Sequence, residues 1–132
     1  MINKIITFIL LISTILMSGC SVLSIINRPP VIDEFYLSKY VAYTGEPINA
    51  SFKYNDPDGD NVYVSIILQK GVQSQYLISN TMLPSTTNVT YQFYIFYSGS
   101  YDLILELDDG KGKTAKTNTV SLSDSSTYDM TI

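Results

Sequence analysis

From Val31 onward, hydrophobic and polar residues alternate in short runs that are separated by turn-forming residues. In Ile48–Tyr54 the apolar side chains occupy every second position, and the same period of two recurs in Val62–Gln69 and in Tyr101–Leu107. Successive side chains of a β-strand point to opposite faces of a sheet, so this pattern predicts strands with one buried face. No helical period is sustained in this part of the chain.

The runs predict about seven strands, the number expected of an immunoglobulin-like antiparallel β-sandwich, which is an all-β fold. Tyr101 stands near the start of the sixth strand, where such folds place a tyrosine whose hydroxyl bonds a nearby backbone group. The first strand is expected to continue raggedly to Tyr43, and Gln75–Ser79 is the weakest of the set. The expected strands are Val31–Leu37, Ile48–Tyr54, Val62–Gln69, Gln75–Ser79, Asn88–Ile95, Tyr101–Leu107 and Thr114–Leu122.

The N-terminus has a different pattern. Lys4 is followed by an apolar run of 13 residues, Ile5–Met17, and then by Ser18-Gly19-Cys20, which holds the only cysteine. A positive start, an apolar run of about 7–15 residues and small residues before a cleavage point are typical of a secretory signal. The segment resembles a bacterial lipoprotein signal peptide, although Met17 stands where that family prefers leucine. The resemblance implies cleavage before Cys20 and attachment of a lipid to its thiol.

Two other interpretations of the N-terminus remain open. The first is that Cys20 is a buried structural cysteine. This interpretation is disfavoured, because Cys20 stands at the end of an apolar leader. In the second, the 22 uncharged residues of Ile5–Ile26 form one membrane-spanning helix, which needs about 20 residues. Lipidation and a spanning helix both leave the C-terminal part outside the cytoplasm, and they differ in whether residues 1–19 survive.

The sequence therefore predicts a leader at 1–19, a lipidated cysteine and short tether at 20–30, a sandwich at 31–122 and a polar tail at 123–132. We expect an extracytoplasmic protein held at the cell envelope by its lipid, in the outer membrane if the organism has one. Only Lys4 among the charged residues lies in the leader, so its removal would change the net charge from −4 to −5. This acidic balance disfavours nucleic acid as a partner.

Three short motifs in order extend the resemblance to a second family. They are Asn27-Arg28-Pro29-Pro30, Asp56-Pro57-Asp58-Gly59-Asp60, and Gly99-Ser100-Tyr101 leading to Asp109-Gly110-Lys111-Gly112. Their order resembles that of bacterial PKD-type and cadherin-like modules over nearly the whole chain after the leader. The Trp-Asp-Phe-Gly-Asp-Gly type motif usual in PKD domains is absent, so the sequence favours no subfamily.

Two acidic turns, at residues 56–60 and 108–109, form the candidate metal site. Calcium takes six to eight hard oxygen ligands, and closely spaced aspartates can supply several. In an immunoglobulin-like sandwich these two loops lie at the same end, which would bring five carboxylates together. The alternative is that Pro-Asp-Gly sequences simply make good turns. The resemblance favours calcium, because such modules often bind it in loops of this kind. The five residues are Asp56, Asp58, Asp60, Asp108 and Asp109.

Catalytic chemistry finds little support in the sequence. The chain has no histidine, and its one cysteine is the expected lipidation site, so the usual base and nucleophile pairs are missing. A carboxylate pair that hydrolyses a glycoside is the remaining enzymatic possibility. We therefore expect no enzyme activity.

The aromatic run Tyr91–Tyr97 is a second candidate site, because exposed rings bind sugars or proteins. Alternation sends about half of these rings into the core, and Tyr94 and Tyr97 are the members we expect at the surface. The leading expectation for function is a non-catalytic module that binds a protein or glycan partner at the cell envelope. The alternative is a calcium-stabilised structural spacer or assembly subunit of the envelope.

Overall fold

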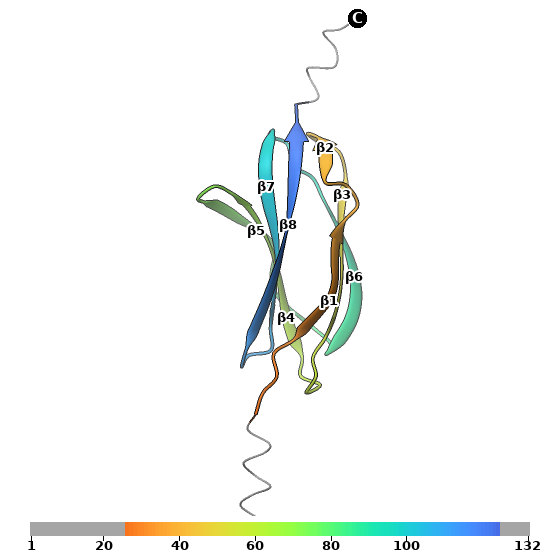
Figure 1. Cartoon of the computed structure of the whole chain (residues 1–132), viewed down its shortest axis with the longest axis vertical. Coiled ribbons are helices and arrows are strands. Elements are labelled where there is room, and N and C mark those ends of the chain that lie inside the picture. The colour runs from red at the N-terminus through yellow and green to blue at the C-terminus, as the bar shows by residue number, and fades with distance from the viewer. Residues whose placement is uncertain (1–25, 125–132) are drawn as a thin grey trace, which may run out of the picture.

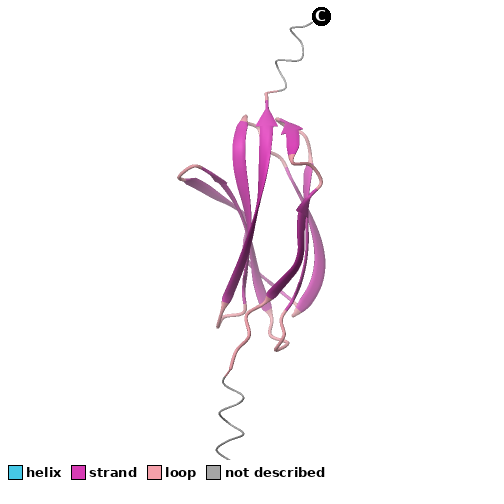
Figure 2. Ribbon diagram, in the orientation of Figure 1, coloured by secondary structure: helices cyan, strands magenta, loops and turns pink. Residues whose placement is uncertain are grey.

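The computed structural model describes residues 26–124, and all of the regular structure in this part of the chain is β-strand (Figure 2). Eight strands follow one another along it. They are β1 (Val31–Leu37), β2 (Val41–Tyr43), β3 (Ile48–Asn55), β4 (Val62–Lys70), β5 (Gln73–Leu83), β6 (Thr86–Phe93), β7 (Gly99–Asp108) and β8 (Lys113–Ser123).

The strands form two sheets that face each other (Figure 1). One has three strands in the order β1-β3-β6, and the other has five in the order β2-β8-β7-β4-β5. Paired neighbours are antiparallel except β2 and β8, which run parallel. The predicted immunoglobulin-like antiparallel sandwich is therefore confirmed.

Alternation explains the core between the sheets. In β3, Ile48, Ala50, Phe52 and Tyr54 are at most 1% exposed, and in β7 the three leucines of Leu103–Leu107 are fully buried. These strands belong to opposite sheets, and because their side chains alternate, each strand turns one apolar face toward the space between the sheets. Tyr101 also packs inward, and its hydroxyl donates to the Tyr97 carbonyl at 2.9 Å, as predicted for this position.

Strand β6 spans Thr86–Phe93, two residues earlier at both ends than the predicted Asn88–Ile95, and larger differences from the sequence prediction occur at two other strands. Val41–Tyr43 is no ragged extension of β1: after Leu37 the chain leaves the three-stranded sheet and pairs with β8 in the other one. Residues 31–43 thus supply one edge strand to each sheet. Gln73–Leu83 is much longer than the predicted Gln75–Ser79, because this edge strand stays largely exposed and carries little alternation.

The described chain starts and finishes at opposite ends of an elongated sandwich (Figure 1). Residues 26–30, the β3–β4 loop and the β7–β8 turn form what we call the lower pole. The β2–β3, β4–β5 and β6–β7 connections form the upper pole.

The predictions of a leader, of lipidation at Cys20 and of most of the polar tail lie outside the described residues. Within residues 26–124, no helix is long and apolar enough to cross a membrane.

Candidate functional site

Three aspartates gather at the lower pole: Asp56, Asp60 and Asp109. Asp56 and Asp60 lie in the loop that carries the chain from β3 in one sheet to β4 in the other, and Asp109 begins the turn between β7 and β8. Each offers one carboxylate oxygen, and these three oxygens lie within 4.8 Å of one another. Asp56 is only 3% exposed and Asp109 only 8%. The two acidic loops therefore meet at one end of the sandwich, as predicted.

One oxygen of Asp56 and one of Asp109 shape their own loops. Asp56 Oδ1 accepts the backbone N–H groups of Asp58 at 2.9 Å and of Asp60 at 3.2 Å. Asp109 Oδ1 accepts the N–H of Lys111 at 2.8 Å and that of the glycine after it at 2.7 Å. Such bonds from an aspartate to the backbone a few residues on are what makes this residue type a turn former. These oxygens support the turn interpretation.

Three other side-chain oxygens at the same pole accept no hydrogen bond. Asp56 Oδ2, Asp60 Oδ2 and Asn27 Oδ1 are buried without a hydrogen-bond partner, and they are the only such side-chain atoms within residues 26–124. Burying an oxygen that carries charge is costly unless a hydrogen bond or a cation compensates it. Lys111 is the nearby cation, with its Nζ 3.6 Å from Asp60 Oδ2, but its side chain is 63% exposed. The arrangement suits a hard cation bound between the loops.

Asn27 is the site residue that the sequence interpretation did not select. It precedes β1, and its Nδ2 donates to Asp109 Oδ2 at 3.0 Å. The amide oxygen of asparagine is a common calcium ligand. The available signal was the position of Asn27 at the head of the Asn-Arg-Pro-Pro motif, the first of the three motifs that carry the resemblance to PKD-type modules.

The structure places Asp58 with a different partner. Its carboxylate accepts the backbone N–H of Arg28 at 2.6 Å, the Nε at 2.9 Å and the Nη2 at 2.8 Å. Arg28 Nη2 also donates to the Pro57 carbonyl at 2.9 Å. This fork of bonds, together with a 2.6 Å bond from Thr114 Oγ1 to the Pro30 carbonyl, fastens residues 27–30 onto the lower pole.

Asp108 also lies outside the cluster of three. Its Oδ1 accepts the N–H of Gly110 at 2.8 Å, and its Oδ2 lies 3.8 Å from Lys113 Nζ. Because Asp108 is the last residue of β7 and Asp109 is the next one, their side chains leave the chain in different directions. Of the five aspartates selected from the sequence, the structure thus brings three together.

The carboxylates of Asp109 and Asp58 are both held in the ionised form. Burial raises the pKa of Asp109, but hydrogen bonds from Asn27, Lys111 and the following glycine outweigh it and leave the pKa below its ordinary value. Hydrogen bonds from the Arg28 backbone and side chain lower the pKa of Asp58. Both groups therefore carry negative charge at neutral pH, which keeps the pole attractive to a cation.

The predicted aromatic site lies at the upper pole, in the chain between β6 and β7. Tyr94 is 48% exposed and Tyr97 is 78% exposed, which agrees with the expectation that these two rings reach the surface. Phe96 is 70% exposed and was not selected from the sequence; its ring stacks on that of Tyr94, with centroids 6.4 Å apart. Phe93 and Ile95 point into the core instead.

Comparison with known proteins found similarity at the level of structure alone. No family model matches the sequence, and neither does any curated protein. A PKD domain of an M14-like peptidase from a Thermoplasmatales archaeon is 22% identical with a TM-score of 0.58, covering 74% of this chain and 98% of that domain. The described chain has a PKD-type, immunoglobulin-like fold.

A second solved structure is more distant. The sporulation control protein Spo0M of Bacillus subtilis is 11% identical with a TM-score of 0.52, and the match covers 73% of this chain and 50% of that protein. At such low identity the PKD-type likeness is one of fold, and function has to be argued from the sites on the sandwich.

Proposed function

We propose that this chain is an extracytoplasmic PKD-type module, non-catalytic, whose lower pole binds one calcium ion. Asp56 Oδ2, Asp60 Oδ2, Asp109 and Asn27 Oδ1 would hold the ion. The observation that carries the proposal is that three buried oxygens without a hydrogen-bond partner lie at the place where three carboxylates meet. When bound, calcium would neutralise part of the negative charge that these carboxylates carry.

The role that follows is mechanical. Asn27 belongs to the segment that precedes the sandwich, while the aspartates belong to two loops of the sandwich itself. An ion shared among them would join the entering chain to both sheets at once, in addition to the Arg28–Asp58 bonds. The module would then act as a stiff structural spacer at the cell envelope.

Calcium titration of the full chain in detergent, followed by calorimetry, tests the metal site directly. We expect one saturable site per chain, with magnesium binding more weakly because that smaller ion demands a compact octahedral shell and gives up water reluctantly. An absence of heat at millimolar calcium would refute the proposal.

Membrane attachment through Cys20 is the second part of the proposal, and it rests on the sequence Ser18-Gly19-Cys20 after an apolar run. Two or three acyl chains would hold the protein on a membrane almost permanently, because each buried CH₂ contributes about 0.8 kcal/mol. Intact-mass measurement of the protein isolated from membranes separates the alternatives. A chain that starts at Cys20 and carries added acyl mass supports the lipid anchor, and an unmodified chain that keeps residues 1–19 supports a spanning helix.

A second candidate function, binding of a protein or glycan partner, is favoured by the upper pole. Phe96 and Tyr97 expose most of their surface there, and the Tyr94–Phe96 stack presents a flat aromatic face. Exposed aromatic side chains are enriched at binding sites because they bury much apolar area at little cost in conformational entropy. Binding of the full chain to isolated cell-envelope material, compared with its Phe96→Ala and Tyr97→Ala variants, tests this candidate.

A further inference from the structure

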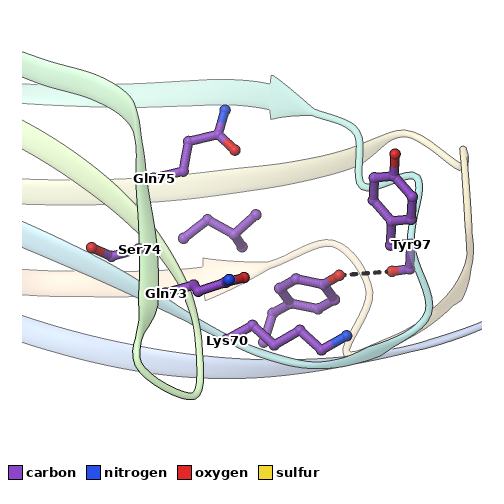
Figure 3. A pocket seen from close by; sticks show the side chains of 7 residues that line it. Lys70, Gln73, Ser74, Gln75 and Tyr97 are labelled. Atoms are coloured by element: carbon purple, nitrogen blue, oxygen red, sulfur yellow. Dashed lines mark hydrogen bonds between the residues drawn. The ribbon is translucent and has the colours of Figure 1, made fainter.

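The upper pole contains a groove between the β4–β5 hairpin and the chain that leads into β7 (Figure 3). Its volume is about 530 Å³, within the range of small-molecule sites. Gln73 and Gln75 of the hairpin lie on one side and Tyr97 on the other, as Figure 3 shows. Leu68, Lys70 and Tyr101 also line it.

The polar residues of this groove occupy positions that face the core elsewhere in the sheet. Val62, Val64 and Ile66 of β4 are at most 1% exposed, and the same face continues through Leu68 to Lys70. Gln75 pairs with Leu68 and Gln73 with Lys70, and directly paired residues of antiparallel strands share a face. The inward face of the hairpin therefore changes from apolar to polar.

The facing sheet explains where this change occurs. Strand β6 ends at Phe93, and the chain then turns toward β7, so no strand of the three-stranded sheet covers the hairpin tip. The hairpin also leans away from the sandwich at this point (Figure 1). The polar inward face and the missing cover together leave a lined groove at the surface.

Lys70 supplies a fixed positive charge. Its Nζ donates to the Ser98 carbonyl at 2.9 Å and lies 5.3 Å from the centroid of the Tyr101 ring, which holds the ammonium in place. An ammonium has three N–H donors, and the bond to Ser98 uses one of them. Among residues 26–124, no carboxylate lines the groove, although the chain as a whole carries a net charge of −4.

We propose that this groove binds an acidic oligosaccharide, one whose sugar units carry a carboxylate. The exposed Tyr97 ring offers a face on which a sugar ring packs, and the two glutamine amides donate and accept hydrogen bonds with its hydroxyls. Lys70 pairs with the sugar carboxylate, which is the strongest type of polar contact available here. Inorganic phosphate or nucleic acid fits less well, because the described residues that line the groove include a single cation, Lys70, and no arginine.

The inference deepens the second candidate function, glycan binding, and is independent of the calcium site. Its test uses the full chain in detergent and three acidic probes: trigalacturonate, a hyaluronan tetrasaccharide and an alginate trisaccharide, with maltotriose as the neutral control. We expect saturable calorimetric binding of at least one acidic probe and much weaker binding of maltotriose. Failure of all three acidic probes, or equal binding of maltotriose, would overturn the proposal.

Matched variants assign the binding to the groove. Tyr97→Ala and Lys70→Gln are expected to weaken the affinity by about tenfold or more. Tyr76→Ala is the control, because Tyr76 is 58% exposed on the same hairpin but pairs with Ile67 on the outward face. Equal losses in Tyr76→Ala and Tyr97→Ala would overturn the assignment.

Two further variants separate this proposal from the others. Asp60→Asn removes a ligand of the calcium site at the opposite pole and should leave sugar binding unchanged. If Phe96→Ala abolishes binding and Tyr97→Ala does not, the groove is the wrong site while the aromatic surface remains a binding surface.

Discussion

Asn27 and Asp109 are 82 positions apart in the sequence, yet the amide of Asn27 donates to the carboxylate of Asp109 at 3.0 Å. This bond joins the segment before the first strand to the turn between the last two strands. The other polar atom of the same amide, Oδ1, is buried beside the aspartate cluster without a partner. One side chain thus links the entering chain to the candidate calcium site.

Replacement of Asn27 by aspartate should change stability in opposite directions with and without calcium. In chelator, Asn27→Asp loses the bond to Asp109 and adds a fourth carboxylate to the cluster, so the melting temperature falls. In calcium, the added charge should increase affinity, because ligand charge helps to set the affinity of calcium sites. Thermal melts in both conditions measure the two effects.

Asn61→Asp serves as the control, since Asn61 is an exposed residue of the same pole. A structural role of Asn27 alone would predict the same loss of stability in calcium as in chelator. That outcome would remove Asn27 from the metal site.

Tyr101→Phe should lower the free energy of unfolding by about 1 kcal/mol, the usual contribution of one hydrogen bond. Tyr101 is 7% exposed, and its hydroxyl donates to the Tyr97 carbonyl at 2.9 Å. Denaturant unfolding measures the change, and Tyr97→Phe is the matched control because that ring is 78% exposed. An unchanged midpoint in Tyr101→Phe would contradict this role of the hydroxyl.

The Arg28–Asp58 pair predicts a dependence of stability on acid. Hydrogen bonds from Arg28 hold the pKa of Asp58 in the folded protein below its ordinary value of 3.8. A lowered folded pKa gives stability that is fully present above the unfolded pKa and is lost as the pH falls through the folded pKa. Asp58→Asn should therefore melt below the wild type at neutral pH.

The difference between wild type and Asp58→Asn should shrink once the pH falls below about 3.8, as Asp58 becomes protonated. Melts in chelator between about pH 7 and pH 3 measure it, with Glu34→Gln on the exposed face of β1 as a control. A difference that stays constant across this range would show that the ionised form of Asp58 contributes nothing.

The strands that alternate most regularly were predicted well from the sequence. The start of β1 at Val31 was predicted, because two prolines precede it, but its end at Leu37 was not, since the run was expected to continue raggedly to Tyr43. The short β2 was missed as a separate strand, since its partner β8 lies far along the chain and three residues carry no period. Gln73–Leu83 was placed too short for a related reason: an exposed edge strand needs no apolar face.

The candidate site was predicted in outline and not in detail. The fold class was enough to bring Asp56 and Asp109 to one pole, because the loops after the second and sixth predicted strands share an end of such a sandwich. Which aspartates turn inward depends on long-range partners that a local pattern does not contain. Asp58 accepts hydrogen bonds from Arg28, 30 residues away, and Asn27 lies at the cluster because its amide donates to Asp109.

The upper groove shows a similar limit. Gln73 and Gln75 look like ordinary surface residues in the sequence, and only their register against Lys70 and Leu68 shows that they face inward. That the facing sheet ends before it reaches them is a property of the whole fold.

The most direct test of the account is a thermal melt of the full chain in detergent, with calcium and with chelator, for the wild type, Asp60→Asn and Asp108→Asn. Calcium at a hundred times its dissociation constant would stabilise the folded state by about 2.7 kcal/mol. A calcium site that includes Asp60 and not Asp108 predicts a calcium-dependent rise of the melting temperature in the wild type and in Asp108→Asn, and none in Asp60→Asn. Equal midpoints of the wild type in millimolar calcium and in chelator would contradict it, and would leave the aspartates as turn formers alone.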